Sequence, residues 1–333
     1  MARTGVVCAG TAVLDVNNII EAWPAEEQIA FIRETILAPG GPPHNAATGL
    51  IKLRAPFPVS MIGVVGDDAY GDVFLAKARA YGLDTSEIRR APGINTDYTH
   101  VMTSASTGRR TFFYHPGANN TLAASHLIPG DDAAKIYYLG SPGLSSSMDR
   151  SDGWRQALAT VRARGFTTCM ELCPVPAETQ RQAVRPCLPL LDYLIINDSE
   201  AEIVAGLPVL REGRLDLDLA EQAARRLLDM GVLQLVVVHH PMGAVAVEKG
   251  GGCQVAASVN VPQAEIVSSV GAGDAFYAGM LFGLHEGWAL TRCLELGNAA
   301  AATSLHSATT SASIKPWKEA LAYAAEKGLR DWT

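Results

Sequence analysis

The stretch Ser268-Ser269-Val270-Gly271-Ala272-Gly273-Asp274-Ala275-Phe276-Tyr277-Ala278-Gly279-Met280 joins a glycine turn, a carboxylate and the start of an apolar helix. Glycines lack a Cβ, so the turn can adopt backbone angles closed to other residues and bring its N–H groups close to a ligand. Apolar residues at helical spacing from 275 to 284 predict a helix. Its N-terminus would combine unpaired N–H groups with about half a positive charge. The stretch therefore predicts an anion-binding turn.

Asp274 lies in the first turn of this helix and has two interpretations. It can be a helix cap, which is a common role for Asp. Beside an anion-binding turn it can also accept the proton of a hydroxyl that attacks a phosphoryl group. In that case the N–H groups of Gly271, Ala272 and Gly273 would stabilise the charge on the transferred oxygens.

Composition limits the classes of partner. With 333 residues, 48% of them hydrophobic, the chain can bury a large core as one α/β domain or as two domains. The net charge of −7 and the lack of a basic run disfavour nucleic acid and membrane surfaces. No apolar run is long enough to span a bilayer and no signal-peptide pattern opens the chain, so we expect a cytoplasmic protein. The six scattered cysteines are expected to be free thiols.

Short apolar runs alternate with helical patterns along most of the chain. Strands are expected at 5–12, 59–65, 136–139, 167–172, 193–196 and 235–238, and helices at 43–52, 71–81, 153–164, 177–190, 219–230 and 317–328. In the run 298–311, the Ser/Thr portion is expected to be a loop. This alternation predicts an α/β fold with a mainly parallel sheet and helices on both faces. Such sheets bind ligands at the carboxyl ends of their strands.

Two segments, 13–39 and 96–114, depart from this alternation. The stretches Tyr98–Thr103 and Arg110–Tyr114 predict antiparallel strands outside the main sheet. We therefore expect the segments 1–12, 40–95 and 115–333 to form the α/β core and the two departing segments to form a small β unit.

Four motifs, taken in order, resemble the ribokinase (PfkB) family of carbohydrate kinases. They are Gly40-Gly41-Pro42-Pro43-His44-Asn45-Ala46-Ala47, Gly63-Val64-Val65-Gly66-Asp67-Asp68-Ala69-Tyr70-Gly71, Asn197-Asp198-Ser199-Glu200 and the Gly-Ala-Gly-Asp turn at 271–274. The resemblance covers nearly the whole chain. It implies a ribokinase-like three-layer sandwich that transfers the γ-phosphate of ATP to a hydroxyl of a sugar, a nucleoside or a similar small molecule. The small β unit corresponds to the family's lid, which often pairs two subunits, so a homodimer through the lid is expected; a solitary edge sheet is the alternative.

The resemblance also implies roles for residues on the acceptor side. Asp274 would be the catalytic base, with Gly271, Ala272 and Gly273 as its anion hole. Asp15 would hold substrate hydroxyls, because a carboxylate can accept from two adjacent hydroxyls at once; the alternative is a turn Asp at a strand end. The family's sugar-contacting segment corresponds here to Gly40, Gly41 and Asn45, although the two prolines that follow Gly41 equally mark a helix start.

On the nucleotide side, Asn197 and Glu200 match an Asn-x-x-Glu motif that organises Mg²⁺ and its waters near the ATP phosphates. As a bare pattern the same residues form an ordinary capping box. Glu171 stands where the family commonly has Asp, and it can belong to the same water and metal network. The expected contacts with ATP are Asn197, His239, Gly243, Asn298 and two glycines of the turn, Gly271 and Gly273.

Several positions depart from the family pattern. His240 stands where a small Gly is expected, although His239 and His240 can both offer ring donors to phosphate. Ser268 and Ser269 replace an Asp and a Thr that help to hold a monovalent cation, so potassium activation is expected to be weak or absent. Gly140 replaces a Glu that touches the sugar in ribokinase itself, so ribose is not the leading substrate.

Arg109, Arg110 and His115 lie on or just beyond the expected lid. Such charges are usually only solvated, but Arg110 or His115 can alternatively meet an acidic group on the substrate, such as a carboxylate, phosphate or sulfonate.

The leading hypothesis is an ATP-dependent kinase of a sugar or sugar derivative. A nucleoside kinase of the same fold is the close alternative, because Phe112, Phe113 and Tyr114 offer an aromatic platform for a base. The third hypothesis is a non-catalytic sugar-binding or regulatory protein, which only the His239-His240-Pro241 departure supports.

Overall fold

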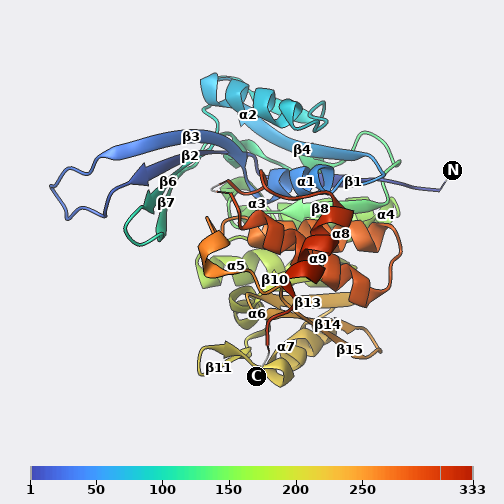
Figure 1. Ribbon diagram of the computed structural model, residues 1–333. Helices are drawn as coiled ribbons and strands as arrows, with labels where there is room; N and C mark the ends of the chain where they lie inside the picture. Colours follow the sequence, from blue (N-terminus) through green and yellow to red (C-terminus); the bar gives the residue numbers. More distant parts are fainter. Residues whose placement is uncertain (1, 308, 332–333) are drawn as a thin grey trace.

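The computed structural model describes residues 2–307 and 309–331, and its centre is a nine-stranded sheet (Figure 1). The sheet order is β15-β14-β13-β10-β9-β8-β1-β4-β5. Neighbouring strands pair in parallel from β5 to β13, and β14 and β15 are added antiparallel. The strands are β1 (Val6–Gly10), β4 (Val59–Gly66), β5 (Ile88–Ala91), β8 (Ile136–Gly140), β9 (Thr167–Glu171), β10 (Tyr193–Asn197), β13 (Leu235–His240), β14 (Gly243–Glu248) and β15 (Cys253–Ala257). The predicted mainly parallel sheet is confirmed.

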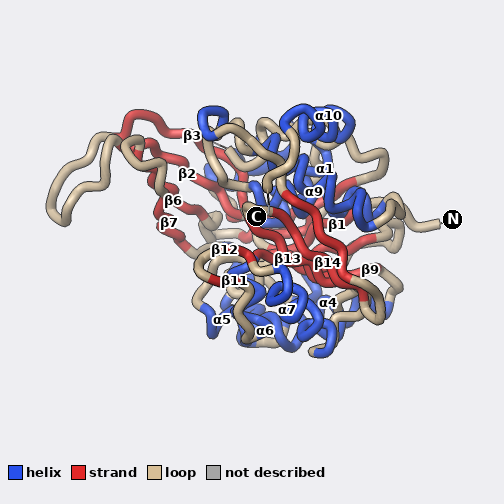
Figure 2. Tube along the Cα trace, turned by 60° about the horizontal axis from the view of Figure 1, so that its bottom comes forward, coloured by secondary structure: helices blue, strands red, loops and turns tan. Residues whose placement is uncertain are grey.

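Helices cover both faces of this sheet (Figure 2). They are α1 (Pro42–Lys52), α2 (Ala69–Ala80), α3 (Ser146–Arg150), α4 (Gly153–Ala163), α5 (Ala177–Val184), α6 (Asp198–Ala205), α7 (Leu217–Asp229), α8 (Ala272–His285), α9 (Leu290–Ser304) and α10 (Trp317–Lys327). Within the described residues, none of these helices is long and apolar enough to cross a membrane.

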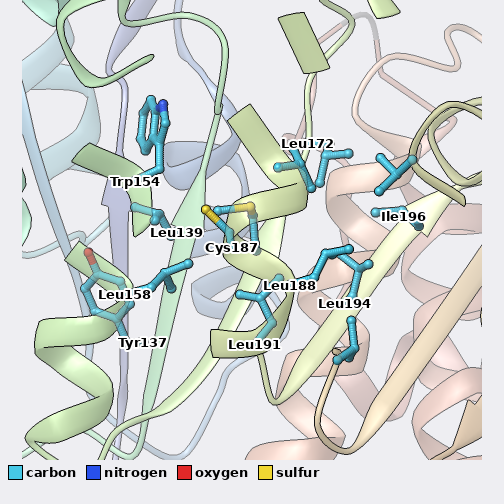
Figure 3. Packing of buried hydrophobic residues seen from close by; sticks show 14 of the residues in the cluster. Tyr137, Leu139, Trp154, Leu158, Leu172, Cys187, Leu188, Leu191, Leu194 and Ile196 are labelled. Atoms are coloured by element: carbon cyan, nitrogen blue, oxygen red, sulfur yellow. The ribbon is translucent and has the colours of Figure 1, made fainter. Parts of the chain in front are cut away.

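Two apolar clusters hold the three layers together. One lies between the sheet and α4 to α7, and the other between the sheet and α1, α8 and α9. Figure 3 shows part of the first cluster, where Trp154 of α4 lies close to side chains of the central strands. Strand β10 serves both clusters: Leu194 and Ile196 join the first and Ile195 joins the second. Because both faces are covered, Leu194, Ile195 and Ile196 are apolar in succession rather than alternating with polar residues.

Two expected boundaries differ from the structure. The helix expected at 177–190 ends at Val184 and continues as a 3₁₀ segment, Arg185–Leu190, because Pro186 and Pro189 have no backbone N–H to donate. The run 298–311 is helical up to Ser304, the end of α9, and residues 305–307 and 309–311 are irregular. The expected loop therefore begins only after Ser304.

A second sheet extends from the core at one side (Figure 1). We call it the lid sheet; its strands are β2 (Val13–Ile20), β3 (Ile32–Gly40), β6 (Tyr98–Ser104) and β7 (Arg110–His115), in the order β3-β2-β6-β7. The hairpins β2–β3 and β6–β7 are antiparallel as expected, but β2 and β6, which join them, pair in parallel. A two-stranded ribbon, Leu210–Arg211 with Arg214–Leu215, completes the strands of the described residues. The division of the chain into a core and a lid domain stays a prediction.

Helices α8 and α9 pack unusually close together because glycines face each other. A Cβ on Gly279 of α8 would lie 2.7 Å from the Cα of Gly297 and 2.7 Å from the carbonyl oxygen of Leu296, both in α9. These are backbone atoms, which cannot move aside cheaply. This contact fixes α8 against α9. It thereby also fixes the position of the anion-binding turn at the N-terminus of α8.

We predict that Gly279→Ala lowers the free energy of unfolding by about 1–3 kcal/mol, the usual cost of overpacking. The better helix propensity of Ala, worth about 1 kcal/mol, opposes this loss only in part. Urea or thermal unfolding measures the change. The control is Gly252→Ala, because a Cβ at Gly252 would meet no atom within 4 Å. Equal stability of the two variants would contradict the predicted close packing.

Candidate active site

Two pockets adjoin at the carboxyl end of the central strands. The hairpin pocket, of about 520 Å³, is lined by residues of the β13–β14 turn, α8 and α9, including His240, Ala272 and Asn298. The lid pocket, of about 370 Å³, lies between the lid sheet and the core. Asn197, His239 and Gly273 line both pockets. The two pockets therefore meet at these three residues, where a chemical group could be transferred from a molecule in one pocket to a molecule in the other.

The structure brings most of the predicted site residues together in the lid pocket. Those that line it are Asp15, Gly41, Asn45, Arg110, Glu171, Asn197, Glu200, His239, Gly271, Gly273 and Asp274. Of the residues expected to contact ATP or the sugar, Gly40 and Gly243 line neither pocket. Gly243 begins β14 opposite His240, and Gly40 lies beside Asp15, where a Cβ would come within 2.2 Å of the Asp15 Oδ2 atom. Gly40 thus makes room for the Asp15 side chain.

The glycine turn has the geometry of an anion-binding helix N-terminus. Gly271 has a φ of 75° and a ψ of 5°, the left-handed region that favours glycine, and a Cβ there would lie 2.5 Å from the Thr310 carbonyl oxygen. Helix α8 begins at Ala272 with no side-chain cap. Among the described residues, the backbone N–H groups of Gly271, Gly273 and Asp274 have no acceptor. These donors are free to bind an anion.

Asp274 does not cap α8 and is held from the side by Asn45. The Nδ2 atom of Asn45 donates to Asp274 Oδ2 at 3.1 Å, and Thr310 Oγ1 donates to Asn45 Oδ1 at 3.1 Å. Burial raises the pKa of Asp274 to about 6, although the hydrogen bonds from Glu171 and Asn45 oppose this shift. Asn45, expected to contact a sugar, also orients the expected base. Thr310 was not singled out by the sequence, because no local pattern links it to a residue so far away in the chain.

Other carboxylates surround Asp274. Asp15 lies within β2 rather than in a turn, and burial together with the charge of Asp274 raises its pKa to about 7. Burial likewise raises the pKa of Glu200 to about 7. Glu171 is hydrogen-bonded to Asp274, and its pKa is raised well above its ordinary value, first by burial and then by the charge of Asp274. The lid pocket therefore favours a cation or hydroxyl groups over a second anion near these residues.

Asn197 and Glu200 form a capping box at the start of α6. Asn197 Oδ1 accepts from the Glu200 N–H at 2.9 Å, and Glu200 Oε2 accepts from the Asn197 N–H at 3.0 Å. The side chains of Asn197 and Glu200 are also hydrogen-bonded to each other. These residues therefore form the helix cap that the sequence left open as an alternative.

Arg110 is a positively charged side chain that lines the lid pocket. Its guanidinium is half-buried, and it donates to Ser268 Oγ at 3.3 Å and to Ser269 Oγ at 3.5 Å. Burial lowers the pKa of Arg110, and no carboxylate among the described residues pairs with it. His115, the other candidate for an acidic group, instead stacks on Tyr98, with the ring centroids 4.8 Å apart, and lines neither pocket.

The two histidines of the nucleotide side differ. His239 packs against Phe276, with the ring centroids 4.9 Å apart, and burial lowers its pKa to about 4, so its ring is neutral at physiological pH. Among the described residues neither of its ring nitrogens has a hydrogen-bond partner. His240 Nδ1 accepts from the Met242 N–H at 3.1 Å and so closes the turn before β14. Asn298 donates to the carbonyl oxygens of Ala256 and Ala257 at 3.3 and 3.1 Å.

Two adjoining pockets with an anion-binding helix N-terminus between them, and a desolvated carboxylate beside it, define a phosphotransferase that acts on two small molecules. The chain matches the pfkB family carbohydrate kinase model over residues 3–318, and it therefore belongs to this family. The predicted class, an ATP-dependent carbohydrate kinase, is confirmed.

Similar proteins agree with this assignment. The chain is 26% identical over 305 residues to a 5-dehydro-2-deoxygluconokinase of Clostridium perfringens, covering 89% of this chain and 86% of that protein. It is 26% identical over 284 residues to an adenosine kinase of Saccharomyces cerevisiae, covering 84% and 81%. The structure of Arabidopsis thaliana ribokinase complexed with ribose and ATP has a TM-score of 0.79 at 23% identity, covering 97% of this chain and 99% of that one. The predicted ribokinase-like fold is confirmed.

Proposed function

We propose that ATP binds in the hairpin pocket, an acceptor binds in the lid pocket, and Asp274 takes the proton of the acceptor hydroxyl as it attacks the γ-phosphorus. One observation carries this proposal: the two pockets share Asn197, His239 and Gly273, and Asp274 lies on the lid side of that junction. A bond forms between the acceptor oxygen and phosphorus, the bond from phosphorus to ADP breaks, and the proton moves to Asp274. The free N–H groups of Gly271, Gly273 and Asp274 stabilise the charge on the transferred oxygens.

Asn197 and Glu200 are the residues that we propose for Mg²⁺, mostly through water. The Glu200 carboxylate lines the lid pocket and fits an ion that prefers oxygen ligands and retains waters. No group of three or more His, Cys, Asp or Glu residues within the described part of the chain could hold a metal alone, which suits an ion bound mainly through phosphates and waters. When bound, the ion neutralises charge on the ATP phosphates.

The position of Arg110 bears on whether a monovalent cation activates the enzyme. Its guanidinium donates to Ser268 and Ser269, so the loop before the anion-binding turn already contacts a fixed positive charge. This supports the expectation that activation by a monovalent cation is weak or absent.

We propose that the acceptor is a sugar acid. A half-buried guanidinium without a carboxylate partner, in a pocket with several carboxylates, would be stabilised by an anionic group on the ligand. The similarity to 5-dehydro-2-deoxygluconokinase, whose name denotes a gluconate derivative, supports this class. Phe112 and Tyr114 also line the lid pocket, so a nucleoside remains the second candidate.

The other partners in this proposal follow from composition. We propose a cytoplasmic protein that acts on small molecules only, since a net charge of −7 disfavours binding to nucleic acid and membranes.

We also propose a homodimer through the lid sheet. Six large apolar side chains of the lid segments are at least half exposed: Trp23 (50%), Ile29 (85%), Phe31 (74%), Ile32 (52%), Phe112 (58%) and Phe113 (51%). Trp23 and Phe113 stack in parallel, with ring centroids 6.1 Å apart. An exposed apolar group of this size is typical of a protein interface, and a second copy of the chain would cover it.

The first prediction of this mechanism concerns the base. Asp274→Asn should lower kcat about 10²–10⁴-fold, because general base catalysis contributes about that much, while leaving ATP binding largely intact. ADP release from Mg·ATP across hexoses, pentoses, sugar acids and nucleosides measures it, with the exposed Asp229→Asn as the control. Near-normal turnover by Asp274→Asn would remove Asp274 as the base. Silence of the unmodified protein across the panel, together with no ATP binding, would favour the non-catalytic binding protein.

The second prediction tests the class of acceptor. Arg110→Ala should raise KM for sugar acids about 10–100-fold, the value of a charge-assisted hydrogen bond, and change KM for neutral sugars far less. The matched control is Arg109→Ala, because Arg109 is the exposed neighbour and makes no ion pair among the described residues. An equal loss for acidic and neutral acceptors would contradict the proposed role of Arg110.

The third prediction concerns assembly. Phe31→Glu should shift the protein from dimer to monomer in sedimentation velocity, since a buried charge in an apolar interface is costly. Val255→Glu is the control, because Val255 is also exposed, at 42%, but lies in the edge strand β15 of the central sheet. A monomer before substitution, or a dimer that Phe31→Glu leaves intact, would contradict an interface through the lid sheet.

A further inference from the structure

His44 is a buried histidine that lines neither the hairpin pocket nor the lid pocket. It stands in the first turn of α1 and is only 1% exposed. Its ring lies edge-on to the ring of Phe74 in α2, with the centroids 5.5 Å apart, and 6.2 Å from the ring of Tyr81. A polar ring in such surroundings costs stability unless its nitrogens are hydrogen-bonded, and an apolar side chain would fill the same space at no such cost. The partners of the two nitrogens therefore indicate what the histidine does.

Both ring nitrogens have partners on α1. Nε2 of His44 lies 3.2 Å from Thr48 Oγ1, and Nδ1 lies 3.4 Å from Asn45 Oδ1. The Asn45 amide continues the connection at both of its ends, since Oδ1 lies 3.1 Å from Thr310 Oγ1 and Nδ2 lies 3.1 Å from Asp274 Oδ2. An unbroken series of hydrogen bonds thus leads from Thr48 to the proposed base.

The direction of these hydrogen bonds follows from the Asp274 carboxylate. An ionised carboxylate only accepts, so the amide nitrogen of Asn45 must face Asp274 and the amide oxygen must face His44. An amide oxygen also only accepts, so Nδ1 of His44 must carry a proton, whether the ring is neutral or charged. Burial lowers the pKa of His44 to about 4, so at physiological pH the ring is neutral and its Nε2 accepts from Thr48.

Of the two partners of Asn45 Oδ1, only His44 can prevent the amide from flipping. The Thr310 hydroxyl can donate or accept, so it satisfies either orientation of the amide. The Nδ1–H group of His44 can only donate, and a flip would place the amide NH₂ group against it, donor against donor. The same flip would turn the amide oxygen toward the Asp274 carboxylate, acceptor against acceptor.

We propose that His44 is a positioning residue whose Nδ1–H group fixes the Asn45 amide with its nitrogen toward Asp274, and that it thereby holds the carboxylate in place for the acceptor hydroxyl. This inference rests on the proposed role of Asp274 as base. Without the ring N–H, the amide is free to flip, and Asp274 then loses the donor that favours its ionised form. The effect should therefore fall on turnover and not on nucleotide binding.

Two substitutions of His44 separate this role from a structural one. In His44→Asn the side-chain Nδ2 takes the place of the ring Nδ1 and can still donate to Asn45. In His44→Gln the side-chain Nε2 takes the place of the ring Nε2 beside Thr48, and the donor to Asn45 is lost. We expect His44→Asn to retain kcat within about threefold, while His44→Gln lowers kcat about five- to tenfold, within the range for one hydrogen bond. KM for ATP should change less than about twofold in both, because His44 does not line the hairpin pocket.

A merely structural role of His44 predicts the opposite order. Asn is smaller than Gln and leaves more of the imidazole volume empty, so His44→Asn should have the lower melting temperature of the two variants. If activity followed packing, His44→Asn would also have the lower kcat. A kcat of His44→Asn equal to or below that of His44→Gln would therefore overturn the proposal.

The route through Asn45 is tested by combining substitutions. If His44 acts only through the Asn45 amide, adding His44→Gln to Asn45→Ala should lower kcat further by less than about twofold. A loss that multiplies in full would show that His44 acts by another route and would overturn this inference alone. Near-normal turnover by Asp274→Asn would instead overturn the proposed function.

Thr48→Val tests the same inference while His44 itself is kept. It removes the donor to Nε2, so the ring can carry its proton on Nε2, and in that form it cannot donate to Asn45. We expect kcat to fall about two- to fivefold. Thr303→Val is the matched control, because Thr303 is also fully buried but its hydroxyl donates to the Ala300 carbonyl oxygen within α9. Equal kcat values for Thr48→Val and Thr303→Val would contradict the proposal.

Discussion

The hydrogen bond from Asn45 to Asp274 joins two helices that lie far apart in the sequence, and the arrangement of the active site depends on it. It is possible only because α1 and α8 pack very closely: a Cβ on Gly49 of α1 would lie 2.6 Å from the Cβ of Ala278 in α8. Helix α8 is fixed in turn against α9 through Gly279. Small residues in the helix interiors thus set the position of a polar contact at the helix ends.

Electrostatics in the site follow from the exclusion of water. Burial raises the pKa of Asp15, Glu200 and Asp274 to about 7, 7 and 6, which makes each carboxylate a better proton acceptor than it would be in solution. The same burial keeps the His239 ring neutral, so it cannot form an ion pair with Asp274 and lower its basicity. Arg110 remains as the positive side chain of the lid pocket.

Local patterns predicted those parts of the molecule that depend on neighbouring residues. The alternation of apolar strands and helices predicted the parallel sheet, and the Gly271 to Asp274 turn predicted the start of α8. Contacts between distant segments could not be predicted in this way. The hydrogen bond of Glu171 to Asp274, the approach of Thr310 to Asn45 and the parallel pairing of β2 with β6 all depend on how layers pack, and no spacing in the sequence encodes them.

The connection between the lid sheet and α1 has a mechanical consequence. Strand β3 ends at Gly40 and α1 begins at Pro42, so Gly41 alone separates them, with a φ of 87° that favours glycine. Pro42 and Pro43 stiffen the first turn of the helix beyond it. Gly41 thus connects the lid sheet to the first turn of α1, which contains Asn45. A displacement of β3 at Gly41 would therefore reach the first turn of α1, which carries the Asn45 amide that donates to Asp274.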